Sequence, residues 1–128
     1  TGKRPSPEME PYAKMIKTLG VDEIAGYFAA QPREASQVKI DRTAVVNGRT
    51  ASKACAACHG EDGRGDQAKG IPDLTGQPPG YLLNQMKLFK AEKRSPGDEA
   101  LTKMKTVMKP LDGATLADLA AYYSSLGR

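Results

Sequence analysis

Hydrophobic residues recur along this chain at intervals of three and four positions, which is the spacing of helices with one buried face. Residues 12–30 predict two short helices that are broken at Gly20. A strong helix begins at Gly80, and a last helix runs from about residue 114 to residue 126. The apolar faces of the second, third and fourth of these helices are made of Val21, Ile24, Ala25 and Phe28, of Tyr81, Leu82, Gln85, Met86 and Phe89, and of Leu116, Leu119, Tyr123 and Leu126. No segment alternates apolar and polar residues as a strand does, so the pattern predicts an all-α fold.

The other segments are less regular. Residues 1–11 are rich in proline and charge and predict an irregular arm, and residues 31–44 are polar and predict a linker. Residues 45–55 can form a helix that leads into a pair of cysteines, and residues 60–80 are rich in glycine and proline. A loop of that length is unusual in a compact domain unless it covers something. We expect residues 95–110 to form a flexible polar segment that carries Met104 and Met108.

These patterns divide the chain into an N-terminal extension, residues 1–44, and a domain, residues 45–128. The extension combines the arm with short helices. Its segment 22–29 resembles segment 117–124 of the last helix, since both place acidic, apolar and aromatic residues in the same order. Two interpretations stay open: the segments are amphipathic helices of similar composition, or the extension is the tail of a second, degenerate domain of the same kind.

Composition indicates a weak core. Hydrophobic residues make up 39% of the 128 positions, Trp is absent and Phe occurs twice. Small domains with little core often gain stability from a disulfide, a metal or a bound cofactor. The net charge of +4 comes without a long basic run, so the sequence does not indicate a nucleic-acid binder. A mild positive excess suits a partner with an acidic docking face. No stretch approaches the ~20 apolar residues that cross a bilayer.

The chemistry of the chain is concentrated in Cys55-Ala56-Ala57-Cys58-His59. Two cysteines at this spacing, followed at once by histidine, are the attachment signature of c-type haem. The thiols bond to the two vinyl groups at one edge of the porphyrin, and the imidazole lies under the iron. A zinc site normally needs four protein ligands, and a thioredoxin-like dithiol expects a βαβ context, so both alternatives fit poorly. Because His59 is the only histidine, an iron-bound His59 leaves no second imidazole for acid–base catalysis.

A sixth iron ligand has to come from elsewhere in the chain. A methionine thioether is the usual partner in electron-transfer cytochromes and raises the reduction potential. Met86 lies on the apolar face of a helix, where core packing is the better interpretation. Met104 and Met108 both lie in the segment expected to fold across a haem face. On the residues alone, either of these two could be the ligand.

From about residue 45 onward the sequence resembles class I cytochromes c, and most closely the domains of periplasmic two-haem cytochromes of the c4 type. Four stretches in the same order carry the resemblance: Cys55–Gly63, Ile71–Gln77, Tyr81–Arg94, and Lys109–Leu111 followed by Leu116–Tyr123. It covers about two thirds of the chain. It implies a helical class I fold wrapped around one covalent haem c, with the first and last helices crossing. It departs from the two-haem pattern because the chain has a single CxxCH.

The resemblance also implies a set of haem-site residues. The iron ligands are His59 and a methionine seven residues before the leucine that precedes the last helix, which is Met104. The carbonyl of Pro72 matches the acceptor of the hydrogen bond from the ligand histidine, which makes the imidazole a better donor. Residues packed close to the haem match Tyr81, Leu82 and Gln85, and Arg94 matches a basic position near the haem edge.

By resemblance, the function is one-electron transport in the periplasm rather than catalysis. The expected partners are redox proteins with acidic docking faces, in accord with seven basic against three acidic residues in segment 87–109. A second hypothesis makes the chain the electron-transfer domain or subunit of a larger oxidoreductase, periplasmic or membrane-bound. A third, a haem peroxidase or gas-binding cytochrome, requires an open sixth position on the iron.

Overall fold

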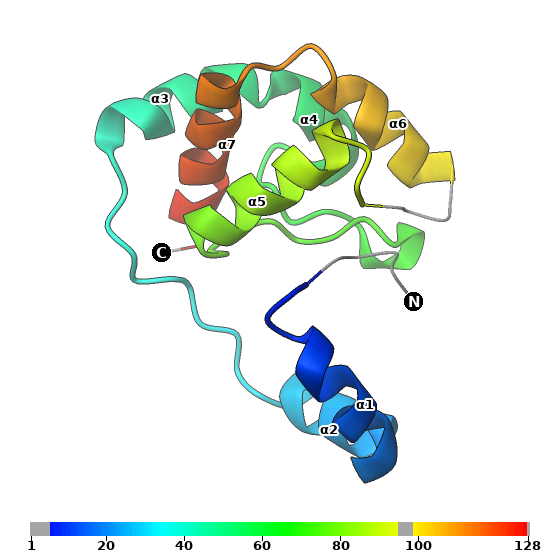
Figure 1. Ribbon diagram of the computed structural model, residues 1–128. Helices are drawn as coiled ribbons and strands as arrows, with labels where there is room; N and C mark the ends of the chain where they lie inside the picture. The colour runs from blue at the N-terminus through cyan, green and yellow to red at the C-terminus, as the bar shows by residue number, and fades with distance from the viewer. Residues whose placement is uncertain (1–5, 95–98, 128) are drawn as a thin grey trace. The chain divides into compact units, whose positions relative to one another are not determined.

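The computed structural model describes residues 6–94 and 99–127. All the regular elements in this part of the chain are helices, and an isolated bridge between Asp66 and Ile71 is its β feature. The predicted all-α fold is therefore confirmed. The chain forms two compact units, Thr1–Glu34 and Ala35–Arg128 (Figure 1). Residues 1–5 of the predicted arm and residues 95–98 lie outside the described residues.

The first unit is a pair of helices, α1 (Glu10–Leu19) and α2 (Val21–Ala29). They are separated by Gly20, as predicted, and this residue has a φ of 104° that favours glycine. Neither helix contains a buried residue. Large apolar side chains are instead exposed, among them Tyr27 at 63% and Phe28 at 68%. The unit thus has little core of its own.

The second unit contains α3 (Arg42–Ala51), α4 (Lys53–His59), the 3-10 turn η1 (Gln67–Lys69), α5 (Pro79–Lys90), α6 (Glu99–Met108) and α7 (Gly113–Ser125). Local sequence explains where several helices begin. The Asp41 carboxylate accepts a hydrogen bond from the backbone N–H of Ala44 at 2.9 Å, and that of Asp112 accepts one from Thr115 at 2.7 Å. Both are side-chain caps of otherwise unsatisfied donors. Pro79 lies at the start of α5, where its missing N–H is not needed.

Helices α3, α5 and α7 form the core of this unit. The largest helix interface joins α3 to α7, and α5 packs on α7 and on α6. The two helices α3 and α7 approach closely at Gly48, where an added Cβ would lie 2.0 Å from the backbone oxygen of Asp118. The buried apolar residues gathered here are Leu82, Met86, Phe89, Met108, Leu116, Leu119, Ala120, Tyr122 and Tyr123. The expected packing of the first helix of the domain on the last is present.

Two expectations need correction. Residues 99–108 form the helix α6 and not an irregular segment. The prolines and glycine at the edges of this stretch suggested a flexible segment, but its interior is made of good helix formers such as Lys and Met, and Met108 is buried in the core. In addition, the helix predicted over 45–55 is two helices that meet at Ser52, and the first begins at Arg42, inside the predicted linker.

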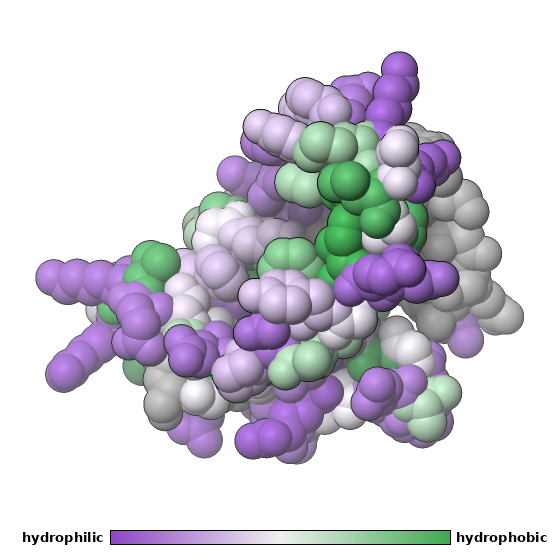
Figure 2. Space-filling view, turned by 90° about the horizontal axis from the view of Figure 1, so that it is seen from below, coloured by the Kyte–Doolittle hydropathy of each residue, from purple (hydrophilic) through white to green (hydrophobic). Residues whose placement is uncertain are grey.

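None of the helices in the described residues is long and apolar enough to cross a membrane. Figure 2 shows one face of the molecule, where hydrophilic side chains predominate and hydrophobic ones are exposed between them.

Candidate haem site

Helix α4 carries the two cysteines and the histidine of the CxxCH motif. Residues three apart on a helix lie on the same side of it, so α4 presents Cys55 and Cys58 together. Both thiols are free; Cys55 is half-buried and Cys58 is exposed. His59 ends the helix and is buried, with 8% of its surface exposed. The arrangement offers two free thiols and one shielded imidazole within five consecutive residues.

The ring of His59 is oriented by the loop that follows α4. Its Nδ1 lies 3.1 Å from the carbonyl oxygen of Pro72, the contact expected from the resemblance. A carbonyl can only accept, so Nδ1 carries the proton and donates it, which leaves Nε2 with a free lone pair. Burial lowers the pKa of His59 below its ordinary value, and the bond to Pro72 opposes that shift. The imidazole is therefore neutral near pH 7 and able to bind a metal through Nε2.

The backbone of Gly65 passes close to the carbonyl of Pro72. The backbone N–H of Gly65 donates to the carbonyl of His59 at 2.8 Å. A Cβ at Gly65 would lie 2.5 Å from the oxygen of Pro72 and 2.4 Å from that of Ile71. With a φ of 70°, this position favours glycine on conformational grounds as well. Glycine lets the backbone pass directly beside the atom that orients His59.

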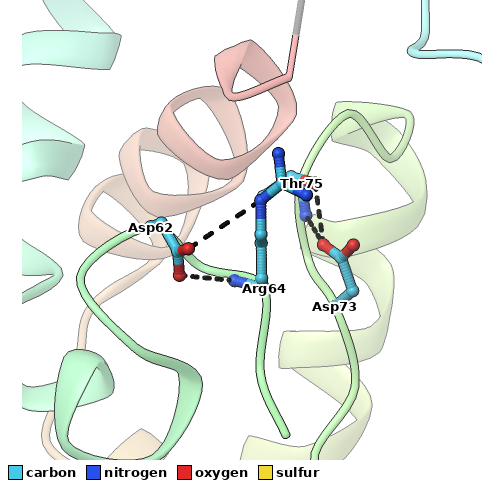
Figure 3. A network of polar contacts seen from close by, with 4 residues as sticks. All are labelled: Asp62, Arg64, Asp73 and Thr75. Atoms are coloured by element: carbon cyan, nitrogen blue, oxygen red, sulfur yellow. Dashed lines mark hydrogen bonds and ion pairs between the residues drawn. The ribbon is translucent and has the colours of Figure 1, made fainter. Parts of the chain in front are cut away.

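Short-range polar contacts stiffen the same loop (Figure 3). The Asp62 carboxylate accepts a hydrogen bond from the backbone N–H of Arg64 at 3.2 Å and lies 3.8 Å from its Nε. The Asp73 carboxylate accepts bonds from the backbone N–H and the hydroxyl of Thr75, at 2.8 and 2.7 Å. Aspartates that bond to the backbone two residues further on are a common way to fix a turn. The glycine-rich loop is thus an ordered support for the histidine.

Cys55 lies beside a buried tyrosine that the sequence analysis treated only as part of an apolar face. The side chain of Tyr123 interacts with those of Cys55 and Ser52, and these interactions affect its pKa and that of Cys55. Burial raises the pKa of the Cys55 thiol, a shift that Tyr123 opposes and the nearby Cys58 reinforces. Burial also raises the pKa of Tyr123 well above its ordinary value. A buried tyrosine hydroxyl usually needs a polar partner, and this rule was the available signal for its role.

Helix α5 and the turn after it hold four of the predicted residues. Leu82 and Gln85 are buried, and Tyr81 is 39% exposed. The guanidinium of Arg94 donates from Nη1 to Oε1 of Gln85 at 2.9 Å and lies 4.4 Å from the centre of the Phe89 ring. This cation–π contact and the hydrogen bond fix a positive charge next to a buried amide. Arg94 is therefore ordered by its neighbours and is not a solvated surface charge.

The three central methionines occupy different environments. Met86 and Met108 are buried core residues, 9% and 4% exposed. Met104 lies one turn before Met108 on α6; it is partly buried and packs at the edge of the core cluster, as Cys55 does. Packing already accounts for Met86 and Met108, whereas the thioether of Met104 lies at the border of the core.

A family model describes this part of the chain. Residues 45–127 match the model of the family named Cytochrome c. The chain belongs to the cytochrome c family. The match begins within α3, runs to the end of α7 and includes the CxxCH motif, and it agrees with the resemblance to class I cytochromes c of the c4 type.

Individual cytochromes are similar over most of the chain. Over 127 residues it is 33% identical to cytochrome c-552 of Acidithiobacillus ferridurans, covering 92% of this chain and 52% of that protein. It is 30% identical over 118 residues to the thiosulfate dehydrogenase electron acceptor of Thiomonas intermedia (strain K12), covering 92% and 48%. The solved cytochrome c4 of Acidithiobacillus ferrooxidans matches with a TM-score of 0.72 and 31% identity, over 93% of this chain and 70% of that chain. The chain spans about half the length of these curated relatives.

The residues present fit haem c, the covalently bound cofactor of this cytochrome family. The donor set consists of two free thiols at the attachment spacing and a neutral imidazole whose Nε2 is unprotonated. When bound, the haem iron supplies one-electron redox chemistry. The protein contributes the thioether links, the orientation of His59 and the buried surroundings, which together set the reduction potential.

Proposed function

We propose that this cytochrome is a one-electron carrier of the periplasm, with haem c held by Cys55 and Cys58 and its iron ligated by His59 and Met104. The observation that carries the proposal is the free cysteine pair beside an imidazole whose tautomer is fixed by Pro72. With both axial positions filled, an electron can be exchanged with little rearrangement. The chain then acts as a carrier and not as an enzyme.

The environments of the methionines support Met104 as the axial ligand. A side chain that is 4% exposed in the core, as Met108 is, is already held by its packing partners. Met104 lies one turn earlier on α6 and packs against the same cluster as Cys55. A residue on a helix that packs on α5 is also held more firmly than one in a loop, which favours a stable iron–sulfur bond.

The test uses the native haem-loaded protein and two matched variants, Met104→Ala and Met108→Ala. We expect Met104→Ala to lose the weak long-wavelength sulfur-to-iron absorption band of the oxidised protein and, once reduced, to bind carbon monoxide rapidly. We expect Met108→Ala to keep the band and to lose about 2–5 kcal/mol of stability, because it removes a buried side chain. Loss of the band in Met108→Ala alone would refute the assignment.

The same spectra distinguish a carrier from a haem peroxidase or gas-binding cytochrome. A wild-type protein that binds carbon monoxide at once on reduction would have an open sixth position and would support that alternative. A mass spectrum of the wild-type protein shows whether the porphyrin is attached at all. Both measurements precede any use of the variants.

Four further residues complete the proposed haem surroundings. Leu82 and Gln85 supply buried surface from α5, and Tyr81 lies at its first turn. Arg94 adds a fixed positive charge through its contacts with Gln85 and Phe89. A positive charge near the haem edge would compensate the negative charge of the haem carboxylates. We assign Arg94 to that edge.

Partners are expected on the basic segment that ends α5 and forms α6. Lys87, Lys93 and Lys109 are exposed there, and this charge suits an acidic face on a redox protein. The relative from Thiomonas intermedia is named as the electron acceptor of an oxidoreductase. We infer that this chain, too, serves an oxidoreductase, periplasmic or membrane-bound, either as a separate carrier or as its electron-transfer domain.

The N-terminal extension is proposed to be the remnant of a preceding cytochrome domain. Its α2 repeats the residue pattern of α7, and relatives about twice as long are aligned over 92% of the chain. The sequence pattern predicts the boundary between the extension, residues 1–44, and the cytochrome domain, residues 45–128. By contacts, residues from Ala35 onward belong with the second unit.

A further inference from the structure

The chain turns from α6 into α7 at a corner that a lysine from α5 holds (Figure 1). Met108 ends α6 and is buried, and the backbone N–H of Leu111 donates to its carbonyl at 3.2 Å, which closes the turn. The Nζ of Lys90, the last residue of α5, donates to the carbonyl of Leu111. Because Leu111 lies between the two helices, its carbonyl takes this hydrogen bond from a side chain.

Packing alone holds α6 less firmly than α7. The interface between α5 and α6 is much smaller than those of α7 with α3 and with α5. Near Lys90 this interface is also polar, since a small hollow there is lined by Lys90, Glu92, Thr102, Lys105, Thr106 and Lys109. An element with little apolar contact opens locally more readily than the core does. A bond at the corner of α6 therefore has a large share in keeping the helix in place.

The charge of Lys90 strengthens its hold on the corner. A charged donor makes a stronger hydrogen bond to a carbonyl than a neutral donor does. The side chain of Lys90 is partly buried, so salt screens this bond less than it would screen a bond on the open surface. The pKa of Asp112, the residue after Leu111, is lowered by its hydrogen bonds to Thr115 and, to a smaller extent, by the charge of Lys90.

We propose that Lys90 is a positioning residue, whose bond to the carbonyl of Leu111 fixes the corner of α6 and so keeps the thioether of Met104 on the haem iron. The inference rests on the proposed ligation by His59 and Met104. Met104 lies one turn before the end of α6, so a movement of the corner moves its side chain. When α6 opens, an added ligand can take the sixth position, and its apparent affinity rises with the fraction of open protein.

The test measures the binding of imidazole to the oxidised haem-loaded protein by absorption spectroscopy. Lys90→Met removes the ammonium and keeps an unbranched stem, whereas Lys90→Arg keeps a charged donor. Lys87→Met is the matched control, because it removes the same charge from an exposed position one turn earlier on α5. Gly48→Ala disturbs the contact between α3 and α7, so it separates a loss of overall stability from a release of α6. Amide hydrogen exchange of α6 and α3, followed by mass spectrometry, gives a second measurement that does not depend on the iron.

We expect Lys90→Met to bind imidazole about three- to tenfold more tightly, the equivalent of one net hydrogen bond, and to speed exchange of the α6 amides without affecting those of α3. Lys90→Arg restores both quantities, and Lys87→Met and Gly48→Ala leave the imidazole affinity unchanged. An unchanged affinity or an unchanged α6 exchange in Lys90→Met would overturn the proposal, as would an equal rise in affinity in Gly48→Ala.

Failure of the proposed function has a different signature. A wild-type protein without attached porphyrin, or a Met104→Ala protein that keeps the sulfur-to-iron band, would refute the proposed ligation and with it the role of Lys90 toward the iron. Faster exchange of α6 in Lys90→Met would still show, in that case, that Lys90 holds the corner of the helix.

Discussion

The contact between α3 and α7 at Gly48 predicts that alanine at this position destabilises the domain, although alanine normally stabilises a helix. Gly48 is buried in the interior of α3, and alanine is a better helix former there by about 1 kcal/mol. In isolation, α3 would therefore gain from Gly48→Ala. In the folded domain the new Cβ would lie 2.0 Å from the Asp118 oxygen, 2.6 Å from its carbonyl carbon and 2.7 Å from Cβ of Tyr122.

The size of the effect follows from these distances. Favourable contacts between heavy atoms lie near 3.5–4.0 Å, so α3 and α7 would have to separate by more than ~1 Å. The atoms in the way are mostly backbone atoms, which cannot rotate aside. Overpacking of this kind costs about 1–3 kcal/mol, and we expect the upper end, which leaves a net loss of about 2 kcal/mol after the gain in helix propensity. For a domain of this size that lowers Tm by roughly 8–16 °C.

The assay is urea unfolding of the haem-loaded protein, followed by far-ultraviolet circular dichroism. Gly113→Ala is the matched control, because Gly113 lies in α7 and an added Cβ there meets no atom within 4 Å. We expect Gly48→Ala to shift the urea midpoint downward with an unchanged slope, and Gly113→Ala to leave it unchanged or raise it. A Gly48→Ala protein at least as stable as wild type would show that the two helices do not meet as described.

Two further predictions concern charge. Hydrogen bonding to the backbone N–H of Thr115 lowers the pKa of Asp112 below its ordinary value of 3.8. The charged cap therefore contributes its full stabilisation of α7 at pH values above 3.8, and this contribution is lost as the pH falls through the lowered pKa. Asp112→Ser keeps an uncharged cap, and its stability difference from wild type, measured by urea unfolding at a series of pH values, should disappear in acid; a difference that grows in acid would contradict this. For docking, Lys87→Glu with Lys109→Glu should slow electron exchange with an acidic redox protein in stopped-flow measurements and flatten its salt dependence, whereas Lys14→Glu in α1 should not. Equal slowing by Lys14→Glu would show that only net charge matters.

Much of the domain could be predicted from sequence because its signals are local. The spacing of the apolar residues Leu116, Leu119 and Tyr123 predicts a helix without knowledge of its tertiary neighbours. The CxxCH motif is likewise recognisable from five consecutive residues. The helix α6 was missed because the prolines and glycine around it dominate the composition of the stretch, while its stability comes from Met108 packing in the core. The residues that flank the stretch indicated a flexible segment, whereas its interior residues and their packing favour a helix.

Other features of the site depend on contacts that sequence spacing does not show. The bond from His59 to Pro72 joins residues 13 positions apart and could be expected only through resemblance to a family. Tyr123 of α7 lies near Cys55 and Ser52 at the start of the domain, and an apolar helical face gives no indication of such polar neighbours. The close passage of Gly65 beside the Pro72 carbonyl likewise requires the folded loop.

Backbone hydrogen bonds join the two sides of the loop between His59 and Pro72 at two places, and they divide it into an inner part near the histidine and an outer tip. Near the histidine, Gly65 bonds back to His59; further out, Asp66 and Ile71 exchange backbone hydrogen bonds of 3.0 and 2.9 Å. Within this loop, only Gln67–Gly70 lie beyond the hydrogen-bonded pair of Asp66 and Ile71, and they are exposed. Residues at such a loop tip can change in number or kind without moving the part of the loop that contacts His59. Natural variation and engineered insertions should therefore collect at this tip, which makes it a suitable place to attach a label or a tether to the protein.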